Sequence, residues 1–113
     1  MSTKDEVIQF LKLMVSSIQM DKLKFIARPV NTNFLRDIGW NYKSLSSFLE
    51  EELCEDDYIK GPENDHNGES GEIWVFGKSI KSKEVYIKIK IISDDCKCLS
   101  FHEATNPLNY HFK

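Results

Sequence analysis

Residues 84–101 read EVYIKIKIISDDCKCLSF, and their alternation of apolar and polar side chains is the clearest structural signal in the chain. A strand over residues 84–92 places successive side chains on opposite faces. One face then carries an apolar set, Val85, Ile87, Ile89 and Ile91. The other face carries a polar set, Tyr86, Lys88 and Lys90.

A second strand over residues 96–102 is expected after a turn at residues 93–95. In that strand Leu99 and Phe101 continue the apolar set, while Ser100 and His102 continue the polar one. The two strands predict a hairpin that packs one face in the core and offers the other for chemistry.

Length and composition are those of one globular domain spanning residues 1–113. The 113 residues are 41% apolar and 29% charged, which is enough to build a core without metal or disulfides. No run approaches the roughly 20 apolar residues of a membrane span, and the N-terminal stretch contains acidic residues, Asp5 and Glu6, where a secretory signal is basic. The 3 cysteines do not make a secreted disulfide framework, so we expect a cytoplasmic protein without membrane partners.

The formal net charge of -3 argues against a protein that coats nucleic acid by bulk electrostatics. Acidic residues concentrate in residues 50–57, whereas lysines concentrate in residues 78–90. Any contact with an anion is therefore expected to be local and to involve the C-terminal half.

Capping residues and periodicity predict helices in the first half of the chain. Thr3 and Glu6 form a capping box for a helix over residues 4–20, and residues 22–27 suit an edge strand. Asn31 or Thr32 is expected to cap a short helix that stops at Gly39, and Ser44 to cap another.

The second half predicts a loop and three strands. Residues 61–71 read as a loop, and strands are expected over residues 72–76, 84–92 and 96–102, with a turn over residues 77–83. We therefore predict an α+β fold in which an N-terminal helix and short helices pack on a C-terminal antiparallel β-sheet.

Three short motifs, in this order, resemble motifs of MqsR-type toxins. They are Asp57-Tyr58-Ile59-Lys60, Val85-Tyr86-Ile87-Lys88-Ile89 and Leu99-Ser100-Phe101-His102-Glu103. Residues 38–42, IGWNY, also resemble that family, so the resemblance covers about residues 33–103. It implies a RelE-like fold and an endoribonuclease toxin of a bacterial type II toxin-antitoxin system, with RNA as substrate, an antitoxin protein as partner and no cofactor.

The resemblance also implies three catalytic positions, at Lys60, Tyr86 and His102. His102 stands where the family usually has a lysine, and a family glutamine has no counterpart because residues 73–75 are Ile, Trp and Val. The acidic net charge also departs from the family, whose toxins are commonly basic.

Metal-free RNA cleavage needs the same residue types independently of any family. The enzyme must take the proton of the 2'-hydroxyl, stabilise charge on phosphorus and protonate the leaving 5'-oxygen. His102 suits the proton transfer, Tyr86 can donate a hydrogen bond, and Lys60 can hold phosphate oxygens. The remaining residues expected to contact RNA are Lys88, Lys90 and Lys78 as cations and Trp74 as a base-stacking ring.

Other interpretations of these residues stay open. Lys88 and Lys90 suit the solvated side of an amphipathic strand, and Trp74 suits the core. The polar face as a whole could be a non-catalytic protein-binding module. A third hypothesis is a metal site made by Cys96, Cys98 and His102.

Overall fold

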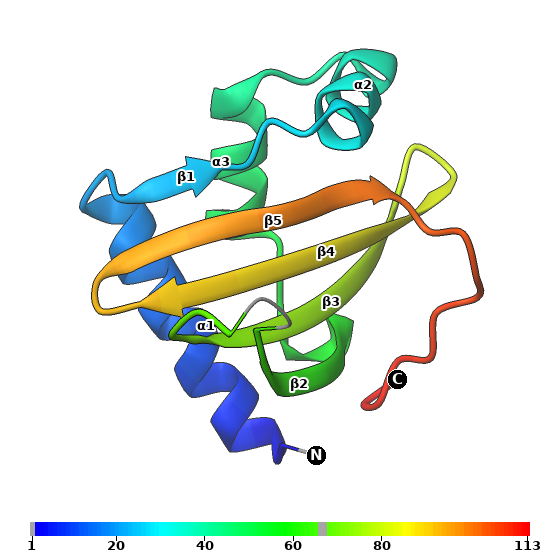
Figure 1. Cartoon of the computed structure of the whole chain (residues 1–113). Helices are drawn as coiled ribbons and strands as arrows, with labels where there is room; N and C mark the ends of the chain where they lie inside the picture. Colours follow the sequence, from blue (N-terminus) through cyan, green and yellow to red (C-terminus); the bar gives the residue numbers. More distant parts are fainter. Residues whose placement is uncertain (1, 66–67) are drawn as a thin grey trace.

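The computed structural model describes residues 2–65 and 68–113, and it confirms the α+β fold class (Figure 1). The helices are α1 (Lys4–Gln19), α2 (Pro29–Ile38) and α3 (Tyr42–Glu51), followed by a single 3-10 turn, η1 (Glu55–Asp57). The strands are β1 (Leu23–Phe25), β2 (Tyr58–Asn64), β3 (Glu72–Ile80), β4 (Lys83–Ile92) and β5 (Asp95–Glu103). No helix in the described part of the chain is long and apolar enough to cross a membrane.

One sheet in the order β1-β5-β4-β3-β2 contains all these strands. The pairs β3-β4 and β4-β5 are antiparallel, as predicted for the meander. β2, which was not predicted as a strand, pairs antiparallel with β3, and β1 lies parallel to β5. The sheet is therefore mixed, and the predicted edge strand occupies one border while β2 occupies the other.

Two helices, α2 and α3, begin earlier than the predicted capping residues. The capping box at Thr3 and Glu6 starts α1 as expected. α2 starts at Pro29, because the fixed φ and missing N–H of proline suit the first helical turn. α3 is capped by Asn41, and Ser44 is its reciprocal partner three residues later.

Two predictions for the sheet are wrong, the end of β3 and the start of the loop after residue 60. β3 continues through Gly77 to Ile80, and the turn is confined to Lys81 and Ser82, whose φ angles are 51° and 69°. β2 was not predicted as a strand, and it takes up the start of the predicted loop as far as Asn64, which an edge strand allows even with Pro62 in it. Of the remaining loop, residues 66 and 67, His66 among them, lie outside the described residues.

A β-bulge at Leu99 changes which side chains of β5 face the core. Lys88 pairs with Ser100 and Ile89 pairs with Cys98, so Leu99 has no partner on β4. Cys98 and Phe101 are consequently both fully buried in the hydrophobic core. The prediction that Leu99 shares the face of Phe101 is wrong, because Leu99 lines a cleft with Lys88 and Ser100 instead.

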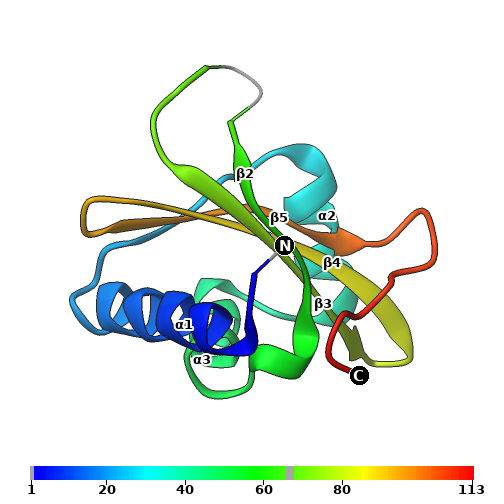
Figure 2. The ribbon, with the colours of Figure 1, turned by 90° about the horizontal axis from the view of Figure 1, so that it is seen from below.

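α1 and α3 cover one face of the sheet, which we call the core face (Figure 2). The ring of Phe10 on α1 stacks on Trp74 with centroids 4.6 Å apart, and Phe48 on α3 meets Phe101 at 5.9 Å. The opposite side, here the open face, carries the alternate residues of β4 and β5. Among these are Tyr86, Lys88 and Lys90 on β4 and Ser100 and His102 on β5.

The chain after β5, residues 104–113, has no regular structure but packs back onto the sheet. The backbone N–H of His111 donates to the Tyr58 carbonyl oxygen at 3.1 Å, and the Phe112 ring stacks on Tyr58 at 5.6 Å. At Gly77 a Cβ would lie only 2.6 Å from Leu108 Cδ1, so the glycine leaves room for the tail. The tail therefore crosses the open face beside Tyr86, which lies opposite Gly77.

Candidate functional site

Tyr86 and His102 form a cross-strand pair on the open face. They are register partners in β4 and β5, and their ring centroids lie 5.6 Å apart. Nδ1 of His102 lies 3.0 Å from the backbone carbonyl oxygen of Glu103. Because a carbonyl oxygen only accepts, Nδ1 carries the hydrogen and Nε2 of the neutral ring is the atom that can take a proton.

The C-terminal tail forms a wall beside this pair. A cavity of about 160 Å³, here the histidine pocket, is lined by Tyr86, His102 and residues 104–108. The tail is held at its start by the Ala104 N–H, which donates to the Glu84 carbonyl oxygen at 2.8 Å. Access to the histidine ring is therefore shaped by the tail as well as by the sheet.

Lys88 stands next to the pair on the same strand face. Its Nζ lies 5.7 Å from the centroid of the Tyr86 ring, and the residue is half-buried. Three of the seven predicted site residues, Tyr86, His102 and Lys88, are thus brought together. They supply a proton acceptor, a hydroxyl group and a cation on one surface.

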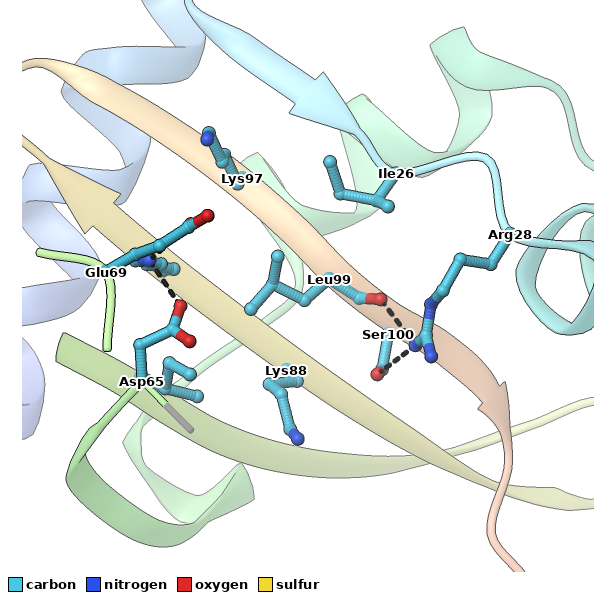
Figure 3. A pocket seen from close by; sticks show the side chains of 10 residues that line it. Ile26, Arg28, Asp65, Glu69, Lys88, Lys97, Leu99 and Ser100 are labelled. Atoms are coloured by element: carbon cyan, nitrogen blue, oxygen red, sulfur yellow. Dashed lines mark hydrogen bonds and ion pairs between the residues drawn. The ribbon is translucent and has the colours of Figure 1, made fainter. Parts of the chain in front are cut away.

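A larger cavity of about 340 Å³ adjoins Lys88, and we call it the Arg28 cleft (Figure 3). Arg28 reaches over β5 from the link between β1 and α2, and its Nη2 donates to the Leu99 carbonyl oxygen at 2.8 Å and to Ser100 Oγ at 2.9 Å. Lys97 also lines the cleft, and Asp65 and Glu69 lie at its other side.

Arg28 is the residue that sequence reasoning missed. The sequence nevertheless contains a signal for the bulge that holds it. Cys98 and Phe101 are both apolar, but a regular strand would place their side chains on opposite faces. That conflict indicates a bulge, and a bulged residue has a carbonyl group free for a partner such as Arg28.

Lys90, predicted to contact RNA, is buried instead. Only 1% of its side chain is exposed, and its Nζ lies 2.5 Å from Oδ2 of Asp65 and 3.6 Å from Oε2 of Glu69. The ion pair satisfies a charge that burial would otherwise penalise strongly. Lys90 is therefore engaged in the wall of the Arg28 cleft rather than free at the surface.

Lys60 does not join the Tyr86 and His102 pair directly. It is 54% exposed and pairs with Glu63 at 3.4 Å, in a separate cavity at the edge of the sheet. In the register Lys60 lies opposite Val75, and Val75 lies opposite Lys88. β3 therefore separates Lys60 from the lysine that neighbours Tyr86.

Lys78 and Trp74 have structural contacts in place of the expected RNA contacts. Lys78 Nζ lies 3.1 Å from Oδ2 of Asp57, a carboxylate that is 1% exposed, and donates to the Glu52 carbonyl oxygen at 3.0 Å. Trp74 is 8% exposed and belongs to the core, where Phe10 stacks on it. Trp74 consequently has no free ring face on the open side of the sheet.

The hypothesis of a metal site at Cys96, Cys98 and His102 does not fit the structure. Both cysteines are fully buried on the core face, whereas His102 lies on the open face. Burial raises the pKa of the Cys96 thiol to about 12, which disfavours the thiolate that binds metal. Within residues 2–65 and 68–113, no group of three or more His, Cys, Asp or Glu side chains is arranged to hold a metal ion.

Comparison of the whole chain with protein-family models and with curated proteins finds no match.

Proposed function

We propose that this chain is a metal-independent endoribonuclease that cleaves single-stranded RNA on the open face of its sheet. In this proposal it is a diverged relative of MqsR-type toxins with a RelE-like fold, acts in the cytoplasm and is inhibited by an antitoxin protein. The observation that supports the proposal best is the contact between Tyr86 and His102 with Lys88 beside them. A proton acceptor, a hydroxyl group and a cation are what phosphodiester cleavage by a neighbouring hydroxyl requires.

The proposed reaction assigns one task to each of these side chains. Nε2 of His102 takes the proton of the 2'-hydroxyl as its oxygen forms a bond to phosphorus. Lys88 stabilises the negative charge that builds up on the phosphate oxygens. The bond from phosphorus to the 5'-oxygen breaks, and Tyr86 donates the proton that the leaving oxygen requires. His102 then releases its extra proton to water and Tyr86 regains one from water, so both side chains return to their starting states.

Lys60 takes a different task from the one expected. Because β3 lies between Lys60 and Lys88, we assign Lys60 to a neighbouring phosphate of the bound strand rather than to the reacting one. Its exposure and its surface pair with Glu63 leave it available, since such pairs are weak.

The chemistry of the RNA ends tests this proposal. Purified protein should cut single-stranded RNA in the presence of EDTA and leave a 2',3'-cyclic phosphate and a 5'-hydroxyl. Cleavage that stops in EDTA, or that leaves 5'-phosphate ends, would show that a different mechanism operates. Expression of the active protein should also arrest growth, and the product of a neighbouring gene should relieve the arrest.

A non-catalytic protein-binding module is the second candidate function. Two observations favour it. Lys78, Lys90 and Trp74 make contacts within the protein instead of being free for RNA, and the net charge is -3. In that case the open face recruits a protein partner, and expression neither arrests growth nor produces new RNA ends. The same growth and RNA-end assays therefore separate the two candidates.

A further inference from the structure

We propose that the Arg28 cleft is a binding site for a phosphoryl group, held by Arg28 and Lys88 with Lys97 at the rim. The cleft has a volume of about 340 Å³, at the small end of the roughly 300–1,000 Å³ range of ligand sites. A planar guanidinium suits phosphate because its N–H groups match the spacing of two phosphate oxygens.

The β-bulge explains why Arg28 is held over the cleft. Leu99 has no partner on β4, and its carbonyl oxygen accepts from Arg28 Nη2 at 2.8 Å and from Asn31 Nδ2 at 3.0 Å. Ser100 Oγ accepts from the same Nη2 at 2.9 Å. Both contacts restrain the guanidinium before any ligand arrives, which lowers the ordering cost of binding.

The rest of the guanidinium is left for a ligand. Across residues 2–65 and 68–113, Nε and Nη1 of Arg28 have no hydrogen-bond partner in the protein. Figure 3 shows the group lying over Ser100, on the side of the cleft that faces Lys88. Several donors therefore remain for phosphate oxygens.

The charges around the cleft favour an anion. Among the described residues, Arg28, Lys88 and Lys97 make no ion pair with a carboxylate. The two acidic side chains in the cleft, Asp65 and Glu69, pair with the buried Lys90. The cleft is thus lined by four cationic side chains, Lys90 included, against two carboxylates.

Ser100 and Lys88 connect the cleft to the Tyr86 and His102 pair. Ser100 accepts from Arg28 and lies opposite Lys88, and Lys88 in turn neighbours the Tyr86 ring. A phosphate in the cleft would therefore lie next to one at the histidine. Its use as a subsite for the adjacent RNA phosphate rests on the proposed function, whereas anion binding in the cleft does not.

Binding measurements with two probes test the cleft. The probes are inorganic phosphate and a 2'-deoxytrinucleotide, which has backbone phosphates but lacks the 2'-hydroxyl needed for cleavage. Each is titrated while the backbone amide signals of residues 97–100 are followed by nuclear magnetic resonance. We expect these signals to shift in the wild type and the affinity to fall roughly tenfold in Arg28→Gln, since a charge-assisted contact is lost.

Arg36→Gln is the matched control, because Arg36 lies on the exposed side of α2 and contacts Asn33 rather than the cleft. It should bind the probes as the wild type does. Arg28→Lys keeps the charge but loses the planar group, so its affinity for the probes should lie between those of the wild type and Arg28→Gln. Thermal unfolding of each variant establishes that the fold is retained, and Lys88→Gln provides a second variant that weakens binding without touching the Leu99 contact.

The outcomes for the cleft and for RNA cleavage are separable. The inference is overturned if neither probe binds, or if Arg28→Gln and Lys88→Gln both bind like the wild type. Binding of the trinucleotide alone identifies a backbone phosphate as the ligand, and binding of inorganic phosphate alone identifies a free phosphate. A protein that binds a probe through Arg28 but never cuts RNA supports the cleft and refutes the proposed function.

Discussion

Nζ of Lys90 lies 2.5 Å from Oδ2 of Asp65, although the two residues belong to different parts of the chain. Alternation along β4 places Lys90 on the same face as Tyr86 and Lys88, where a lysine would ordinarily be solvated. The segment that follows β2 brings Asp65 over this position and closes it from water. The position of Lys90 in the strand therefore does not predict that its side chain is buried.

Replacing Lys90 should be much more costly than replacing Lys88. Lys90→Ala removes one partner of a buried ion pair, and we expect the free energy of unfolding to fall by about 3 kcal/mol. Lys88→Ala, two residues away on the same face, should change it by less than about 1 kcal/mol, since Lys88 is half-buried and makes no ion pair among the described residues. Urea unfolding measures both; equal losses would contradict the burial of Lys90.

Trp74 should behave as a core residue. Trp74→Ala is expected to lower the free energy of unfolding by about 3 kcal/mol or more, because the ring packs on Phe10. In a Trp40→Phe background Trp74 is the single remaining tryptophan. Its fluorescence should then resist quenching by acrylamide and should not change when RNA is added. Strong quenching by RNA would restore the base-stacking interpretation.

The three cysteines should differ in reactivity. Burial raises the pKa of Cys96 to about 12 and also raises the pKa of Cys98, so both thiols stay protonated and inert in the native state. Cys54, which is only half-buried, should react first with a thiol reagent. Because the folded pKa values are raised, the thiols contribute stability that is lost as the pH rises above the ordinary value of about 8.5. Two fast-reacting thiols in native protein would contradict this arrangement.

The contact between Tyr110 and Glu84 should stabilise the tail in a pH-dependent way. Tyr110 Oη donates to Glu84 Oε2 at 2.8 Å, and burial together with this bond raises the pKa of the phenol. Tyr110→Phe should lower the free energy of unfolding by about 1 kcal/mol at neutral pH. Since the raised pKa favours the neutral phenol in the folded state, the difference should narrow as the pH rises above about 10. A difference that grows with pH would contradict the assignment.

The alternating hairpin was predictable because it depends on local sequence. Val85, Ile87 and Ile89 are fully buried as expected, and Tyr86 and His102 share the other face. β2 was not predicted as a strand because Gly61 and Pro62 look like a turn, whereas an edge strand accommodates both.

The parts of the site that were not predicted depend on tertiary contacts. Arg28 is held by a bulge on a strand about seventy residues further along, and Lys90 is buried by the segment that follows β2, two strands away in the sheet. The bulge has a local sign in the spacing of Cys98 and Phe101, but nothing in the local sequence identifies Arg28 or Asp65 as the distant partner. Trp74 was ambiguous for a related reason, since the partner that buries it, Phe10, lies on the first helix.

RNA cleavage by His102→Ala, compared with His111→Ala, tests the central claim most directly. Both variants lose an imidazole, but His102 lies in the histidine pocket whereas His111 is an exposed residue of the tail. With a labelled single-stranded RNA, we expect His102→Ala to lose at least about a hundredfold in cleavage rate and His111→Ala to stay close to the wild type. Equal rates for the wild type and His102→Ala, both correctly folded, would contradict the account.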